Sequence, residues 1–318
     1  MDDTDHFPEL NEEETMKRIN RNLIGLLITL ALLIATAGTA LAQQRIDETK
    51  PASATGLVQI VNIAGSVKIT GWDRNEVRVT GTLGEGTERL DFTVEGEETT
   101  IEVVLPKRTP DEDQRIEGSD LEIMLPRGSR VDARTVSADI TVGDVTGALN
   151  LNSISGEIDV NGMPGRVRVE SISGNVDIEG STGSIRAKSI AGGVTIGQVT
   201  GTFDVGTVTG AIKMMAVAVE DGACASLSGS IWLDATLASD GSLELESHSG
   251  TIELHVPANI SATFDIETFS GDVKNAFGQE AERRSEYVPG KELHFTNGGG
   301  DGTVTINAFS GLVIIAHK

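Results

Sequence analysis

The chain has 318 residues, of which 48 are acidic and 25 are basic, and its formal net charge at pH 7 is −23. This charge excludes nucleic acid as a partner and disfavours anionic membrane surfaces, because both would repel the protein. The single cysteine, Cys224, excludes an internal disulfide, so stability has to come from backbone pairing and apolar burial.

The first 42 residues resemble a signal peptide preceded by an acidic segment. Three basic residues precede the apolar run Leu23–Ala35, and Ala40-Leu41-Ala42 has the small-residue pattern of a cleavage site. We expect cleavage between Ala42 and Gln43, and hence an exported protein of the periplasm or cell envelope. Removing three basic and seven acidic residues leaves a net charge of −19. The alternatives are an uncleaved membrane anchor and a true start at Met16.

Residues 43–56 are expected to be a linker, and residues 57–130 an irregular N-terminal cap. The stretch Leu57–Leu83 alternates apolar and polar residues between glycine turns, and a second alternating stretch follows before the charged loop at residues 107–118. Such alternation over short runs is typical of β-strands.

Residues 131–274 contain a repeat. Octets related to SISGEIDV begin at intervals of eighteen residues and then of nineteen, twenty-one and twenty-one, and glycine recurs every nine residues from Gly147 to Gly210. Their first residues are Thr135, Ser153, Ser171, Ser189, Thr207, Ser226, Ser247 and Thr268. The pattern predicts an all-β fold, namely a parallel β-solenoid (a single-stranded β-helix) of about 18-residue coils, in which each coil depends on its neighbours.

Each class of repeat position has an expected role. Apolar residues recur two, four and seven places after each glycine, and the first two of these should face inward. We expect the hydroxyls of Ser153, Ser171, Ser189 and Thr207 to form a structural ladder or to satisfy corner backbone groups, rather than to act as nucleophiles. We expect glycine corners with positive φ, which a residue without Cβ adopts freely, at Gly156, Gly174, Gly192 and Gly210.

Three outward residues are candidates for binding. Asp159 and Asp177 should be neighbours on adjacent coils, and Trp232 should point outward between Ile231 and Leu233, either as a contact anchor or covered by the loop at 275–300. A carboxylate pair is also what a glycoside hydrolase requires. The histidines and Cys224 lack metal-ligand spacing, so we expect no metal site and no cofactor.

Residues 275–318 are expected to form a polar excursion and C-terminal capping strands. Both ends of a solenoid need such caps, because uncovered strand edges promote end-to-end association. The protein is therefore expected to be a monomer, or to self-associate end to end if a cap is poor.

Several segments resemble the bacterial putative-adhesin family of β-strand repeats, a domain of unknown function. They are GSVKITGWDRNEVRV, the T-x-S-G octets, the LP-x-G and VPANIS segments, and GDGTVTINAFSGLVII, so the likeness covers Leu57 to Ile315. The resemblance implies an exported or membrane-tethered solenoid without an established activity, and it supplies no catalytic residues.

The function expected from these observations is non-catalytic binding or scaffolding at the cell envelope. The partner would be an envelope protein or a glycan, and a membrane only if the N-terminal segment stays uncleaved. Two alternatives remain open. One is a carbohydrate-active β-helix enzyme using Asp159 and Asp177, and the other is a membrane-tethered regulator of envelope stress.

Overall fold

The computed structural model describes residues 44–107, 117–181, 183–285 and 288–318, and these form 22 β-strands and no helix. The all-β expectation is therefore confirmed for the described part of the chain. The predicted signal segment and its cleavage site at Ala42 and Gln43 lie outside it. Within the described residues, no helix is long and apolar enough to cross a membrane.

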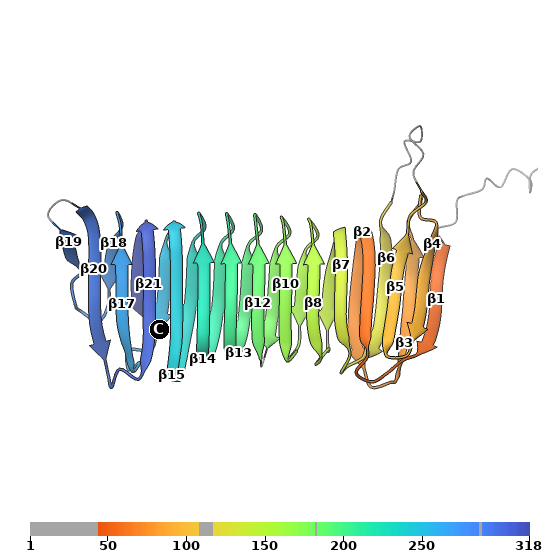
Figure 1. The fold of residues 1–318 in the computed structure, drawn as a ribbon, viewed down its shortest axis with the longest axis horizontal. Coiled ribbons are helices and arrows are strands. Elements are labelled where there is room, and N and C mark those ends of the chain that lie inside the picture. The colour runs from red at the N-terminus through yellow and green to blue at the C-terminus, as the bar shows by residue number, and fades with distance from the viewer. Residues whose placement is uncertain (1–43, 108–116, 182, 286–287) are drawn as a thin grey trace, which may run out of the picture. The chain divides into compact units, whose positions relative to one another are not determined.

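The central strands run side by side and pair in parallel (Figure 1). Ser153 pairs with Ser171, and Ser171 with Ser189, so neighbouring strands are offset by eighteen residues. The strands are β7 (Arg130–Gly143), β8 (Ala148–Ser153), β9 (Ile158–Asn161), β10 (Arg166–Ser171), β11 (Val176–Ser181), β12 (Ser184–Ser189), β13 (Val194–Thr207), β14 (Ile212–Ser226) and β15 (Ile231–Ser249).

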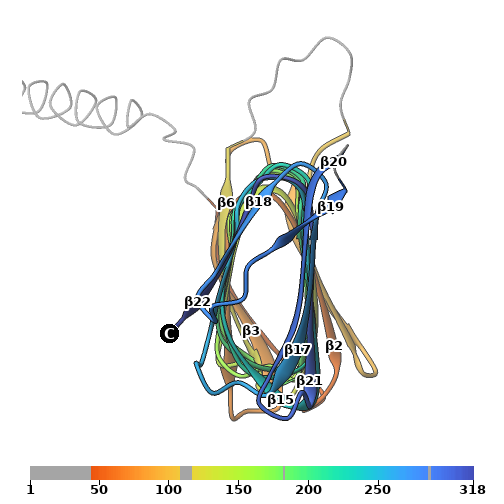
Figure 2. The ribbon, with the colours of Figure 1, turned by 90° about the vertical axis from the view of Figure 1, so that its left-hand side faces the viewer.

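The strands form two layers with the core between them. One passage of the chain through both layers is called a lap, and successive laps overlie one another in Figure 2. We call the layer that contains β8, β10 and β12 face A, and the layer that contains β9 and β11 face B. β7, β13, β14 and β15 contribute to both layers. Along each strand buried aliphatic residues alternate with outward ones, as in Val167 and Val169 beside the exposed Arg168. Because each strand is too short to enclose a core, neighbouring laps bury one another's apolar side chains.

The glycines at 156, 174, 192 and 210 lie in the bends between consecutive strands, but the conformational reason we expected for them is wrong. None of the four has a left-handed φ. A Cβ on Gly174 would instead lie 1.9 Å from the carbonyl oxygen of Gly156, and one on Gly192 would lie 2.1 Å from that of Gly174. Glycine is required because stacked bends approach each other too closely for any side chain.

Replacing Gly174 by alanine should lower the free energy of unfolding by about 2 kcal/mol or more, because the added methyl meets backbone that cannot move without breaking the register. Gly143→Ala is the matched control, since a Cβ there meets nothing within 4 Å. Its effect should stay within about 1 kcal/mol. Urea denaturation of both variants measures the difference, and equal stabilities would refute the close-approach explanation.

At the N-terminal end of the stack, an early strand lies between strands that come later in the chain. The strands of this end are β1 (Gln44–Pro51), β2 (Leu57–Trp72), β3 (Glu76–Leu83), β4 (Arg89–Glu95), β5 (Glu98–Val104) and β6 (Ser119–Pro126). β2 lies between β7 on one side and β5 and β6 on the other, and is parallel to all three. The first lap of this region is therefore paired along both edges instead of ending the stack.

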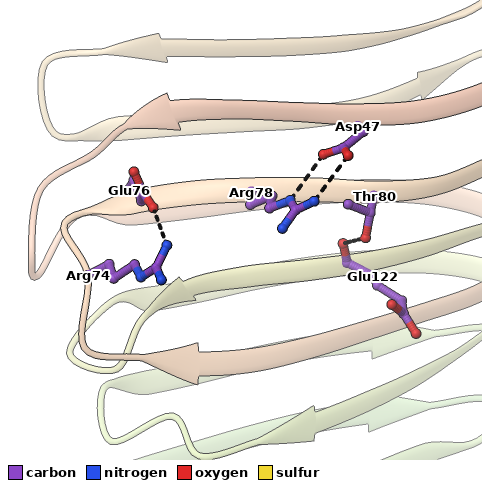
Figure 3. A network of polar contacts seen from close by, with 6 residues as sticks. All are labelled: Asp47, Arg74, Glu76, Arg78, Thr80 and Glu122. Atoms are coloured by element: carbon purple, nitrogen blue, oxygen red, sulfur yellow. Dashed lines mark hydrogen bonds and ion pairs between the residues drawn. The ribbon is translucent and has the colours of Figure 1, made fainter.

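The expected linker at residues 43–56 is wrong for residues 44–51, which form β1. This strand pairs antiparallel with β3, and β3 pairs antiparallel with β6. Figure 3 shows the polar contacts between these strands: Arg78 donates two hydrogen bonds of 3.0 Å to the Asp47 carboxylate, and the Thr80 hydroxyl donates to the carbonyl of Glu122 at 3.4 Å. β1 and β4 are antiparallel edge strands that cover this end.

At the C-terminal end, the last two strands of the chain likewise lie between strands that come earlier. The strands of this end are β16 (Ile252–Val256), β17 (Ala262–Thr268), β18 (Asp272–Asn275), β19 (Glu282–Ser285), β20 (Val288–Asn297), β21 (Gly302–Ser310) and β22 (Leu312–His317). β21 lies between β15 and β17, and β22 lies between β16 and β18. The last strands were expected to help cap the stack, but β21 and β22 lie between other strands instead. The cap is β20, from the polar excursion at 275–300 that was also a candidate cap; it pairs antiparallel with β17 and with β19.

Candidate binding surface

The predicted hydroxyl residues are buried and serve the bends. The hydroxyl oxygen of Ser153 accepts a hydrogen bond from the backbone N–H of Gly156 at 2.9 Å, and those of Ser189 and Thr207 accept from Gly192 and Gly210 at 3.0 Å each. Ser171 instead donates to the carbonyl of Gly174 at 2.9 Å. Each of these hydroxyls thus pairs with a backbone N–H or carbonyl group of its own bend.

Cys224 is also buried, and burial raises the pKa of its thiol to about 12. A thiol that stays protonated at neutral pH is a poor nucleophile and a poor metal ligand. Within the described ranges, no group of three or more His, Cys, Asp or Glu residues could hold a metal ion.

Asp159 and Asp177 are brought together as expected, since they are direct partners in the parallel pair of β9 and β11 on face B. The pKa of Asp159 is raised, first by partial burial and then by the charges of Asp177, Glu157 and Asp139. The pair is therefore a site of repulsion between like charges.

Replacing Asp159 by asparagine should raise the free energy of unfolding at pH 7. Because the pKa is raised in the folded state, the ionised carboxylate is less favourable there than in the unfolded chain. The cost is present above the raised pKa and disappears as the pH falls below the ordinary value of 3.8. We expect a gain of a few tenths to about 1 kcal/mol, given solvent screening.

Asp177→Asn should give a smaller gain of the same sign, since it removes the repulsion between the pair but not the cost of burying the Asp159 carboxylate. The double variant should gain less than the sum of the two, as measured by chemical denaturation at pH 7 and pH 3. Additive gains that persist at pH 3 would contradict this account.

Trp232 points outward between the buried Ile231 and Leu233, and is itself half-buried. Its cover comes from neighbouring strands of face B. The His255 ring lies 5.4 Å from the Trp232 ring, and the Lys213 ammonium lies 5.7 Å from the ring centre. Trp232 remains a candidate contact residue, but much of its ring is already occupied by these neighbours.

A row of outward apolar residues runs along one bend of the stack. Eight of them are between 37% and 53% exposed, and His248 lies in the same row. Backbone hydrogen bonds link the bends that carry successive members, for example from the N–H of Ala191 to the carbonyl of Ile172 and from the N–H of Thr209 to that of Ile190. We call this row the apolar ridge: in stacking order it comprises Val136, Ile154, Ile172, Ile190, Val208, Leu227, His248, Phe309 and Phe269.

The aromatic end of the ridge depends on the insertion of β21. Phe309 lies between His248 and Phe269, with ring centres 4.6 Å and 4.7 Å apart and nearly parallel planes. The facing surfaces of these rings cover one another, so solvent meets mainly ring edges between them. Sugars bind the open faces of aromatic rings, and this geometry therefore favours an aliphatic or protein contact over a glycan.

The apolar ridge is the feature that sequence reasoning missed, because the seventh position after each glycine was recognised as apolar but was not assigned to the surface. Strand alternation nevertheless indicates its direction. Positions two, four and six places after a glycine share one parity, and after Gly147 these are Leu149, Leu151 and Ser153, which are all buried. The seventh place, Ile154, has the opposite parity and is exposed. The repeated outward position was therefore present in the period-two pattern.

Residues 56–315 match the family described as Toastrack DUF4097. The chain belongs to this family, whose fold is β-solenoid-like, and the resemblance to an adhesin-like domain of unknown function is confirmed. Among curated proteins, none matches this chain.

Two similar solved structures each cover 86% of the chain. A "putative lipid binding protein" from Parabacteroides distasonis is 13% identical, with a TM-score of 0.50 and 96% of its own chain covered. A "putative adhesin" from Bacteroides fragilis is 10% identical, with a TM-score of 0.41 and 98% of its chain covered. Identities this low speak to the fold alone.

Proposed function

We propose that this protein is an exported, non-catalytic binding or scaffolding protein of the bacterial cell envelope, in which a parallel β-solenoid holds the apolar ridge rigidly in line. The observation that carries the proposal is the ridge itself. Nine laps place a side chain at the same outward bend, and at the spacing of β-strands the row extends for roughly 40 Å. A continuous exposed apolar surface of this kind is typical of an interaction site.

Further support comes from the way in which the ridge is built. Most members follow a buried hydroxyl residue whose hydrogen bond holds the bend, as Ser153 does for Ile154, whereas Phe309 follows Ala308. The ridge residues are therefore already ordered before a partner binds, and association loses little conformational entropy. The solved structure with a TM-score of 0.50 is named for lipid binding, and a lipid contact suits such a surface.

Polar substitutions on the ridge should abolish most of the binding to the envelope. In the variant Ile154→Asn/Ile172→Asn/Ile190→Asn, each change removes roughly 1 kcal/mol of apolar contact, so we expect at least a tenfold weaker association of the purified exported protein with envelope preparations. The control Met163→Asn changes an exposed apolar residue outside the ridge. If the ridge variant folds and binds as wild type does, the ridge is not the contact surface.

Export itself has a separate test. N-terminal sequencing of the protein recovered from the envelope should begin at Gln43, because the small residues before it form the cleavage pattern. A protein that retains the apolar segment would be tethered to the membrane, and this result would favour the regulator hypothesis.

A further inference from the structure

A basic trough lies on face A of this acidic protein. Six basic side chains project from β7, β10 and β12, whereas the carboxylates beside them on this face are those of Asp132, Glu170, Asp204 and Asp221. The basic residues are Arg130, Arg134, Arg166, Arg168, Arg186 and Lys188. The local excess of positive charge contrasts with the net charge of −23 for the whole chain.

The trough has its shape because β8 carries short outward side chains. Ala148, Asn150 and Asn152 lie in register between the outward residues of β7 and those of β10, with Asp132 beside Asn150 and Glu170 beside Asn152. The groove over them has a volume of about 620 Å³, and the two asparagine amides add hydrogen-bond donors to its floor.

Two of the arginines have no acidic partner within the described residues. Arg134 pairs with Asp132 at 2.7 Å and Arg168 with Glu170 at 2.6 Å, and these pairs offset the two carboxylates. Arg130 and Arg166 line the same groove without an ion pair in this part of the chain. Their guanidinium groups are available to an anionic ligand, and the fork of N–H donors suits a phosphate or carboxylate group.

The trough continues into the apolar ridge. Arg134, Asn152 and Glu170 line both the trough and a second groove of about 430 Å³. The other wall of this second groove is formed by Ile154, Ile172 and Ile190 of the ridge. A charged site and an apolar row thus form one surface.

We propose that this surface binds a long-chain anionic amphiphile, with its phosphate-like headgroup in the trough beside Arg130 and Arg166 and its hydrocarbon chain following β8 and β10 for roughly 20 Å to reach Ile154, Ile172 and Ile190. The inference rests on the proposed role of the ridge as a contact surface, and adds the chemical class of the ligand. Each methylene group removed from water contributes about 0.8 kcal/mol, and the arginines select for negative charge.

The negative net charge of the chain does not oppose this ligand as it opposes an anionic membrane surface. At physiological salt, charges more than about 8 Å away are largely screened, so a single headgroup in the trough responds mainly to the arginines around it.

The experiment is calorimetric titration of the purified exported protein with 1-oleoyl lysophosphatidate below its micelle concentration, because its long acyl chain reaches from the headgroup site to the ridge. Inorganic phosphate tests the headgroup alone, and 1-oleoyl lysophosphatidylcholine carries the same chain on a head without net charge. We expect the lysophosphatidate to bind at least tenfold more tightly than either. Arg166→Gln should weaken it about tenfold, whereas Arg74→Gln, an equal change of charge at a distant exposed arginine, should leave it unchanged.

Equal affinities of the Arg166→Gln and Arg74→Gln variants would overturn the headgroup assignment without affecting the role of the ridge. Inorganic phosphate binding as tightly as the lysophosphatidate would show a simple anion site and would overturn the assignment of an amphiphile. A dimer in sedimentation that Arg166→Gln dissociates would assign the trough to a second copy of this acidic chain, and would also overturn the proposal. Wild-type binding by the folded ridge variant in the envelope assay would instead refute the proposed function.

Discussion

The close approach of backbone to backbone at stacked bends is the constraint on which the rest of the structure depends. The carbonyl oxygen of Gly156 occupies the place where a Cβ of Gly174 would lie, and the same relation recurs from Gly192 to Gly210. Laps that stack this closely keep their strands within hydrogen-bonding distance over their whole length. Side chains one repeat apart thereby become direct neighbours, and a residue type repeated in the sequence becomes a row in space.

The two ends show how a stack of laps is closed without a separate domain. At each end a lap is inserted between two others, β2 at the N-terminal end and β21 with β22 at the C-terminal end. Inserted strands are paired along both edges, which leaves antiparallel strands such as β1 and β20 to cover the outermost positions. Such long-range pairings require the chain to close large loops before they form, so we expect folding to begin in the regular central laps.

Stacking also separates functions by position on the lap. Inward positions build the core, hydroxyls hold the bends, the position after the hydroxyl forms the apolar ridge, and outward positions of face A collect the arginines of the trough. Because pairing with the neighbouring laps fixes the position of each strand, the charge of an outward side chain can change in one lap without altering the stacking of the others. The carboxylates of Asp159 and Asp177, which oppose each other on face B, show that the fold tolerates even unfavourable neighbours.

The sequence by itself determined the all-β class, the eighteen-residue spacing, the pairing of Ser153 with Ser171 and the vicinity of Asp159 to Asp177, because each follows from a local period that repeats many times. The direction of Ile154 and its equivalents was also readable from strand parity. Only the tertiary structure decided that β21 inserts before β17, so that Phe309 meets His248 and Phe269, and that residues 44–51 pair with β3. These contacts join segments far apart in the chain, and no local pattern specifies which free edge a distant strand will occupy.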